Sequence, residues 1–386
     1  MNSKWTTARL KDLALINRES YSRSDGWDFV NYLDTGSITK GVIDKITLID
    51  LRHEKLPSRA RRKVAPYDII YSTVRPNQEH YGIIRHPVAN MLVSTGFVTI
   101  TAKEGVDAQY LYYYLSQPQI TTYLHAIAEQ RVSTYPALNV SDLEELPITV
   151  PPLRIQQEIG EMLSCLDAKI ALNKRINENL EEQAQAIFKS WFVDFEPFQD
   201  SDFVESQYGW IPQGWRLGRL GEFIEVTSGK RPIVKTNQRT PNNKVPVIGA
   251  SRVMGYTNES LFDDRVLVIG RVGTHGVVQR IDFPCWPSDN TLVIKSQFYE
   301  FAYQVLKRID YSSINRGSTQ PLITQRDLRN QVIVVPPESV LRRYEDVASS
   351  LLEVVRNNLR ENQTLSSLRD TLLPKLMSGE IEVPVV

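Results

Sequence analysis

The second half of this chain repeats the first half. Residues 131–152 match residues 316–337 at a constant offset of 185 positions and without a gap, and the match continues for about forty residues more. The front of each copy also matches, with Trp5 corresponding to Trp215 at an offset of 210, so the copies differ by insertions between these landmarks. Each half is therefore predicted to be a variable globular part, then two consecutive prolines, then a long helix.

Each globular part is expected to mix strands and helices. Runs of β-branched and aromatic residues between turn signals predict strands at residues 67–74, 97–101, 265–269 and 291–294. Short helices are expected at residues 107–115 and near 299–308. The predicted class is α+β, with about 150 residues in each globular part.

After the paired prolines, each half carries the apolar seam of a coiled-coil helix, with alternating steps of four and three. The seam residues are Ile159, Leu163, Leu166, Ile170, Leu180, Ala184, Ile187 and Trp191 in the first copy, and Tyr344, Ala348, Leu351, Val355, Leu365, Leu372 and Leu376 in the second. Pro374 and then Gly379 are expected to end or kink the second helix. About forty residues give a rod of roughly 60 Å.

Asparagine interrupts each seam at matched places, at Asn173 and Asn177 in the first copy and at Asn358 and Asn362 in the second. A buried asparagine in a seam costs stability but fixes the register, because only one alignment pairs the amides. If the helices pack antiparallel about a pseudo-twofold axis, Asn173 meets Asn362 and Asn177 meets Asn358. Simple solvation of these side chains is the alternative, and their recurrence in both copies favours pairing.

A chain that holds both copies can close the helix pair on itself, although an oligomerisation rod is also open. The predicted architecture is two pseudo-twofold-related α/β domains separated by two long antiparallel coiled-coil helices. Duplex DNA has local twofold axes, and proteins mirror its half-sites with that symmetry. Two dissimilar globular parts are therefore expected to read different halves of a bipartite, asymmetric DNA site, with the helices setting the distance between them.

Charge is balanced overall but is uneven along the chain. The 45 basic residues match the 45 acidic residues, which excludes a protein that coats DNA by bulk charge. Residues 52–63 hold six cations against one anion, Glu54, and residues 230–244 hold five cations and no anion. A solvated face is the ordinary explanation of such a run, and the presence of one in each copy favours DNA binding.

Composition excludes several other classes of protein. No run of about 18 apolar residues exists, so no membrane span is expected, and the start of the chain lacks the apolar region of a signal peptide. The two cysteines, Cys165 and Cys285, fit a reducing compartment, so a cytoplasmic location is expected. The five histidines show no ligand spacing, and no metal site is predicted.

Five motifs follow one another in a specific order and spacing. They lie at residues 5–13, 150–158 (Val-Pro-Pro-Leu-Arg-Ile-Gln-Gln-Glu), 188–195 (Phe-Lys-Ser-Trp-Phe-Val-Asp-Phe), 209–221 and 372–380. In this order they resemble the specificity subunits of type I restriction–modification systems, over essentially the whole chain. The resemblance implies two target-recognition domains, at 1–150 and 196–335. It also implies two coiled-coil segments, at 151–195 and, with a tail, at 336–380.

The same resemblance implies a non-catalytic DNA-specificity subunit of a bacterial or archaeal cell. Its expected partners are double-stranded DNA, two methyltransferase subunits that methylate adenine, and restriction subunits that translocate and cut unmodified DNA. S-adenosylmethionine, ATP and magnesium would belong to those partners. The residues agree, because neither proline pair, at 151–152 or 336–337, has the preceding Asp or Asn and following aromatic of an adenine methyltransferase, and Gly229-Lys230-Arg231 does not match a phosphate loop.

Residues shared by two readers of different sequences cannot discriminate bases, so they are candidates for phosphate contacts, with a structural turn as the alternative. They are Arg131, Ser133 and Thr134 and their counterparts Arg316, Ser318 and Thr319. Base contacts are expected from long polar side chains in the dissimilar segments, where solvated surface is the alternative. The candidates are Arg59, Arg61, Arg62, Lys63, Arg75, Asn77, Gln78 and Tyr135 in the first copy, and Lys230, Arg231, Lys235, Asn237, Gln238, Arg239, Arg271, His275 and Gln320 in the second.

Two other functions stay open from the residues alone. One is a coiled-coil scaffold whose two globular ends bind protein partners, and the other is a stand-alone methyltransferase, which would bind S-adenosylmethionine. Sequence-dependent, salt-sensitive binding to DNA would separate the specificity subunit from the scaffold.

Overall fold

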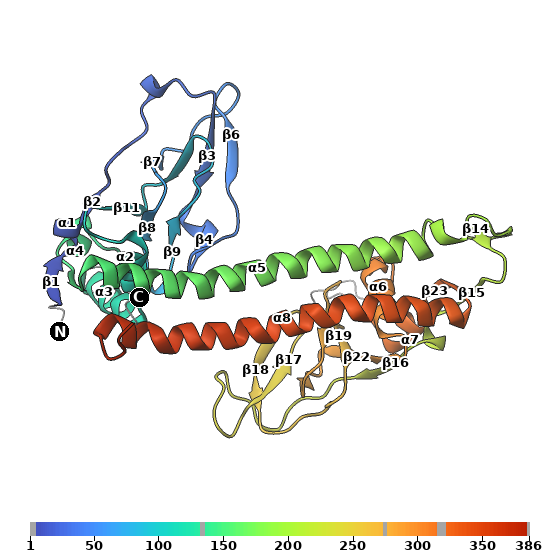
Figure 1. Ribbon diagram of the computed structural model, residues 1–386. Coiled ribbons are helices and arrows are strands. Elements are labelled where there is room, and N and C mark those ends of the chain that lie inside the picture. The colour runs from blue at the N-terminus through green and yellow to red at the C-terminus, as the bar shows by residue number, and fades with distance from the viewer. Residues whose placement is uncertain (1–4, 132–135, 273–275, 315–321, 384–386) are drawn as a thin grey trace. The chain divides into compact units, whose positions relative to one another are not determined.

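The computed structural model describes residues 5–131, 136–272, 276–314 and 322–383 (Figure 1). Its contacts divide the chain into two compact units, Met1–Asn173 with Arg360–Val386, and Lys174–Leu359. Two long helices, α5 (Leu153–Phe192) and α8 (Glu338–Ser378), are each shared between the units. Each unit therefore combines one globular domain with one half of each long helix.

A four-stranded antiparallel sheet forms the core of the first domain. Its order is β2-β11-β8-β9, with bounds Ala14–Ile16, Phe97–Ala102, Asp68–Ser72 and Tyr81–Ile84. Every residue of β8 and β9 is buried, as expected for strands covered on both faces. Helices α2 (Ala108–Leu115) and α3 (Pro118–Arg131) add Tyr110, Leu111, Leu124 and Ala128 to this core. Both strands and the helix predicted for this domain are confirmed.

A second sheet of the first domain has the order β6-β3-β10-β7, with bounds Thr47–Asp50, Phe29–Leu33, Met91–Ser94 and Ala60–Lys63. Strand β10 runs parallel to β3 and antiparallel to β7. Alternate residues of β10 face opposite sides, because Met91 and Val93 join a cluster with Ile70 and Phe97 of the first sheet, whereas Leu92 joins a separate cluster. A small hairpin, β4 (Ile38–Thr39) with β5 (Val42–Ile43), accompanies the two sheets.

The second domain carries the same core sheet. Its order is β16-β22-β19-β20, with bounds Glu225–Ser228, Thr291–Lys295, Val266–Gly270 and Val278–Ile281. Its second sheet has three strands in the order β18-β17-β21, with bounds Val253–Thr257, Val245–Ile248 and Trp286–Pro287. Where the first domain has β7, the second has a single bridge between Phe262 and Cys285. Both strands predicted for this domain and the helix α6 (Tyr299–Arg308) are confirmed.

In each domain, the segment where the chain enters pairs with the segment where it leaves, in a two-stranded antiparallel ladder. In the first, β1 (Thr6–Arg9) pairs antiparallel with β12 (Pro147–Val150), beside α1 (Leu10–Leu13) and α4 (Val140–Glu144). In the second, β15 (Arg216–Arg219) pairs with β23 (Val332–Val335), beside α7 (Gln325–Arg329). A hairpin of β13 (Phe203–Ser206) and β14 (Gly209–Pro212) precedes β15. The matched ladders give both domains the same closure.

The long helices bury seven of the fifteen predicted seam residues, and the other eight are half-buried. In α5, Ile159, Leu163 and Ala184 are buried, and in α8 Tyr344, Ala348, Val355 and Leu376 are buried. Helix α8 continues through Pro374 and ends at Ser378, before Gly379, whose φ is +75°. Gly379 therefore ends the helix, because a left-handed backbone suits glycine, and Pro374 does not.

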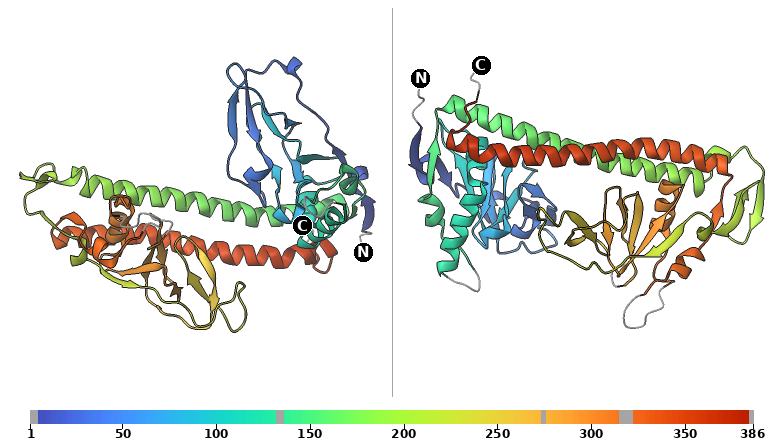
Figure 2. Two further views of the ribbon diagram at one scale, coloured as in Figure 1. Left: turned by 180° about the vertical axis from the view of Figure 1, so that it is seen from behind. Right: turned by 90° about the horizontal axis from the view of Figure 1, so that it is seen from below.

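Within each unit the two helix halves run antiparallel. In the first unit Asp167 of α5 pairs with Arg369 of α8 at 2.7 Å, and Lys169 pairs with Glu361 at 3.3 Å. In the second unit the Phe188 ring lies 5.8 Å from the Tyr344 ring, between centroids. Figure 2 shows the end of α8 close to β1, and a Cβ on Gly379 would lie 3.2 Å from the Trp5 ring. None of the described helices combines the length and apolarity needed to cross a membrane.

Candidate DNA-recognition surfaces

Strand β7 carries Arg61, Arg62 and Lys63, the last three cations of the run at residues 52–63, and Arg59 lies just before the strand. Arg59 and Arg61 are exposed, whereas Arg62 and Lys63 are half-buried. Burial lowers the pKa of the Arg62 guanidinium, and its Nε has no hydrogen-bond partner among the described residues. Arg59 and Arg61 are therefore accessible to DNA, and Arg62 is partly withdrawn.

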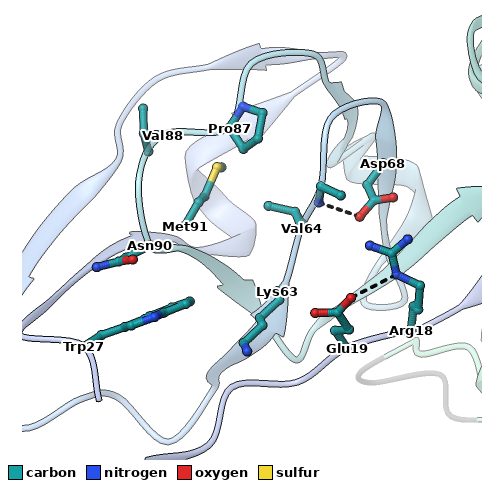
Figure 3. Close-up of a pocket in the computed structure, with 11 residues that line it drawn as sticks. Arg18, Glu19, Trp27, Lys63, Val64, Asp68, Pro87, Val88, Asn90 and Met91 are labelled. Carbon is teal, nitrogen blue, oxygen red and sulfur yellow. Dashed lines mark hydrogen bonds and ion pairs between the residues drawn. The ribbon is translucent and has the colours of Figure 1, made fainter. Parts of the chain in front are cut away.

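The positive charge of Lys63 is already balanced by a carboxylate within the first domain. Its Nζ lies 2.7 Å from Asp25 Oδ1, which holds the pKa of that carboxyl below its usual value, and 5.3 Å from the centre of the Trp27 ring. Figure 3 shows Lys63 and Trp27 in the wall of a pocket of about 220 Å³, together with the ion-paired Arg18 and Glu19. A cation with a carboxylate partner gains less from a phosphate, so the ion pair weakens the case for Lys63 as a DNA-binding candidate.

Arg75, Asn77 and Gln78 lie together in a tight turn after β8. The turn η3 (Pro76–Gln78) follows Arg75, whose φ is +46°, and all three nominated side chains are exposed. The Arg75 amide donates to the Pro136 carbonyl at 2.9 Å. The backbone at Pro136 therefore lies beside this turn.

Six of the residues nominated in the second domain lie in the loop between β16 and β17. All six are exposed: Lys230, Arg231, Lys235, Asn237, Gln238 and Arg239. Trp286 Nε1 donates to the Lys230 carbonyl at 2.7 Å, and Thr236 exchanges two main-chain hydrogen bonds with Tyr256 of β18. The loop is thus tied to the second sheet at two points.

Arg271 follows the core strand β19, as Thr73 follows β8 in the first domain. The Ile323 amide donates to the Arg271 carbonyl at 3.0 Å, and the Leu138 amide donates to the Thr73 carbonyl at 2.8 Å. Arg271 is half-buried, and its Nε is without a hydrogen-bond partner among the described residues. Arg271 therefore stands at the same edge of its sheet as the Arg75 turn does in the first domain.

Several nominated residues lie outside the described part of the chain. They are Ser133, Thr134, Tyr135, His275, Arg316, Ser318, Thr319 and Gln320, together with the side chain of Arg131. Their proposed contacts with phosphates and bases stay predictions.

The two basic runs occupy different places in the shared topology. In the first domain the run lies between β6 and β8, whereas in the second it lies between β16 and β17. The segment of the second domain that corresponds to β7 contains Phe262 followed by Asp263 and Asp264. The domains therefore share a framework and differ in where they place positive charge.

The four seam asparagines lie in two pairs, one in each unit. In the first unit Asn173 Nδ2 donates to Asn362 Oδ1 at 2.9 Å and to Glu361 Oε2 at 2.7 Å. In the second unit Asn358 Nδ2 donates to Asn177 Oδ1 at 2.8 Å. These are the partners expected from an antiparallel pairing, and the role of the amides in fixing register stays a prediction.

Sequence reasoning missed a carboxylate that ties α6 to α8 within the second unit. Glu345 accepts hydrogen bonds from the main-chain amides of Phe301, at 2.8 Å, and Glu300, at 3.2 Å, at the start of α6. In the first unit the matching role belongs to Asp107, which caps α2 by accepting from the Tyr110 amide at 2.8 Å. The offset of 185 would have matched Glu345 to Gly160, but nothing in the sequence indicates what either position contacts.

A buried ionic network surrounds the same junction. Glu300 is fully buried and lies 2.8 Å from Arg265, 3.1 Å from Arg280 and 3.9 Å from Arg356. Arg280 also pairs with Glu181 of α5 and stacks 3.5 Å above the Tyr303 ring. Charges at this depth are tolerated only when paired, so the network fastens the second domain to its halves of the long helices.

Comparison with known proteins gives the family. The model described as "Type I restriction modification DNA specificity domain" matches residues 2–182 and again residues 212–346. The chain is 31% identical to the MjaIX specificity subunit of Methanocaldococcus jannaschii, over 86% of this chain and 81% of that protein. It is 24% identical to the HindI specificity subunit of Haemophilus influenzae, over 98% of this chain and all of that protein.

A solved structure agrees with the fold. The crystal structure of the S subunit of a type I restriction–modification system from M. genitalium matches 97% of this chain and 96% of its own, with a TM-score of 0.57 and 17% identity. Both recognition-domain matches and the two curated relatives point to one family. The chain belongs to the type I restriction–modification DNA specificity family, as a specificity subunit that serves in DNA recognition.

Proposed function

We propose that this subunit binds a bipartite, asymmetric DNA site, with one half-site read by each globular domain. Both domains contain the same four-stranded core sheet, but each carries its positive charge at a different place in the topology. This observation carries the proposal. A shared framework suits a shared task, and different exposed side chains suit different base sequences.

The antiparallel helix pair is the proposed spacer between the domains. Contacts between α5 and α8 in each unit support an antiparallel arrangement, and paired asparagines in both units support a single register. A spacer of constant length would set the number of unread base pairs between the half-sites.

Two methyltransferase subunits and the restriction subunits are the proposed protein partners. Methylation of adenine and cleavage of unmodified DNA would take place on those partners, and this chain would determine which DNA sequence is bound. The relatives are named as specificity subunits of type I restriction enzymes, which supports this division of work.

Mapping modified adenines in genomic DNA, with and without the gene, tests the proposal directly. The expected result is one bipartite motif with a constant gap that vanishes with the gene. A continuous motif, or unchanged methylation, would contradict it.

Variants in the first domain then test the division of labour. Arg61→Ala with Arg62→Ala should weaken recognition of one half-site by about tenfold or more and leave the other unchanged. Arg52→Ala is the matched control, because Arg52 Nε already pairs with Asp50 Oδ1 at 2.9 Å. Equal relaxation of both half-sites would show that the domains do not read separately.

A further inference from the structure

One stretch of the second domain presents free cations and apolar side chains together. No Asp or Glu occurs between Val226 and Asn258, a stretch that contains Lys230, Arg231, Lys235, Arg239, Lys244 and Arg252. All six cations are exposed, and none of them forms an ion pair or a side-chain hydrogen bond with another described residue. In the first domain, by contrast, Arg52 and Lys63 have carboxylate partners. The second domain thus keeps its positive charge available for an anionic partner.

Ile233 lies inside this cationic stretch and is 96% exposed, more than any other large apolar side chain in the described part of the chain. Val234, Val253 and Met254 in the same stretch are 42%, 44% and 41% exposed. A single exposed apolar residue needs no explanation. Four of them among unpaired cations indicate a partner that offers both negative charge and an apolar group.

The loop that carries Ile233 is anchored on both sides. On one side the Lys230 amide donates to the Pro287 carbonyl at 2.9 Å, and a Cβ on Gly229 would lie 2.2 Å from the Ser288 carbonyl oxygen. On the other side Thr236 is paired with Tyr256 by bonds of 2.9 and 2.8 Å. Residues 231–235 therefore span two fixed points, so little ordering is required when Ile233 meets a partner.

The surface beside the loop is hollowed. Lys235, Asn237, Arg252, Met254 and Tyr256 line a hollow of about 480 Å³ between the loop and β18. Its lining combines cations, an amide and apolar side chains. In the major groove, phosphates form the rim and base edges form the floor, and the thymine C5-methyl is the apolar group on that floor.

We propose that Ile233 is a specificity residue of the second domain, which contacts the C5-methyl group of a thymine while the neighbouring cations hold phosphates. The inference rests on the proposed function, because it needs the second domain to read a half-site. The proposed contact adds a thymine to the half-site, whereas arginine suits guanine and asparagine and glutamine suit adenine.

Replacing thymine by uracil removes only the methyl group, so it isolates this contact. The complex of this chain with its methyltransferase subunits is titrated with duplexes that carry uracil at each thymine of the half-sites in turn. At one position we expect about fourfold weaker binding, the value of one buried methyl group. Ile233→Ala should weaken binding to the thymine duplex by a similar factor and remove the sensitivity to uracil at that position.

Two controls make the result specific. Ile233→Val should keep most of the uracil sensitivity, and Ile43→Ala, a 38% exposed isoleucine of the first domain, should leave it unchanged. Uracil sensitivity that persists in Ile233→Ala, or that is absent at every position of the wild-type complex, overturns the inference while DNA recognition stands. A complex that binds all duplexes equally overturns the proposed function itself.

Discussion

Glu345 of α8 and Gly160 of α5 occupy the same position of the repeat. Glu345 itself supplies a carboxyl group to the start of a neighbouring helix, whereas Gly160 leaves space for the carboxyl group of another residue. Glu345 reaches the start of α6 and accepts from the Phe301 amide at 2.8 Å. Gly160 leaves room for Asp107, since a Cβ there would lie 2.7 Å from Asp107 Oδ1. The N-termini of α2 and α6 thus each have a carboxyl group that accepts a main-chain hydrogen bond, but only α6 receives it from another element.

The first prediction concerns the pH dependence of the second unit. Burial raises the pKa of Glu345 to about 7 from an ordinary value of 4.5. A carboxyl with a raised pKa in the folded state contributes its full stability below pH 4.5, and this contribution is lost as the pH rises to about 7. Glu345→Gln should therefore reduce the loss of stability between pH 4.5 and pH 8 by on the order of 3 kcal/mol, measured by urea unfolding.

Glu353→Gln is the control for this measurement, because Glu353 is an exposed residue of the same helix. The buried Glu300, whose pKa is also raised by burial, is present in both variants, and because its charge interacts with that of Glu345, the measured change includes this coupling. An unchanged pH profile in Glu345→Gln would contradict the assignment.

Gly160→Ala tests the close approach of α5 to α2. Alanine improves helix propensity by about 1 kcal/mol, but its methyl group would meet Asp107 Oδ1 at 2.7 Å and the Tyr110 amide at 3.1 Å. We expect a net loss of about 1–3 kcal/mol in the free energy of unfolding. The loss should be smaller in an Asp107→Ala background, and an equal loss there would show that the contact is not the cause.

Asn362→Leu tests the amide pair of the first unit. It removes the acceptor 2.9 Å from Asn173 Nδ2, and Asn173 is fully buried. We expect a cost of about 1–3 kcal/mol, because a buried amide loses a partner. Adding Asn173→Leu should recover most of that stability, since two apolar residues fill the seam. Additive losses in the double variant, measured by denaturant unfolding, would contradict direct pairing.

Charge removal in the β16–β17 loop tests contacts with phosphates. Lys230→Ala and Arg239→Ala should each reduce the slope of log K against log salt by about one wherever the side chain holds a phosphate, with similar loss on all DNA sequences. Lys295→Ala is the control, because Lys295 Nζ pairs with Asp264 at 2.9 Å. Slopes unchanged in both loop variants would remove this loop from the DNA interface.

The sequence predicted the parts of the fold that local pattern and repetition determine. The core strands β8, β11, β19 and β22 are rich in β-branched and aromatic residues, and the seams of α5 and α8 have clear periodicity, so both could be predicted. The repeat located the four seam asparagines, and antiparallel packing about a pseudo-twofold axis predicted that Asn173 meets Asn362 and that Asn177 meets Asn358.

The missed features depend on contacts between distant segments. The last three cations of the first run, Arg61, Arg62 and Lys63, lie in strand β7. Their side chains have different surroundings, so Lys63 contacts Asp25 and Trp27 while Arg61 is exposed. No local sequence pattern around Glu345 indicates that its side chain accepts a hydrogen bond from the start of α6. Pro374 inside α8 shows the same limit, since tertiary packing maintains a helix that local propensity would end.

The ladders β1–β12 and β15–β23 make each domain a module with adjacent ends. Because a single pair of short strands closes each domain, everything between Arg9 and Pro147, or between Arg219 and Val332, can be replaced without rerouting the backbone on either side. Exchange of one such cassette between homologous genes would give a hybrid with one old and one new half-specificity. New target sequences are then reachable by recombination in a single event, without a series of point mutations.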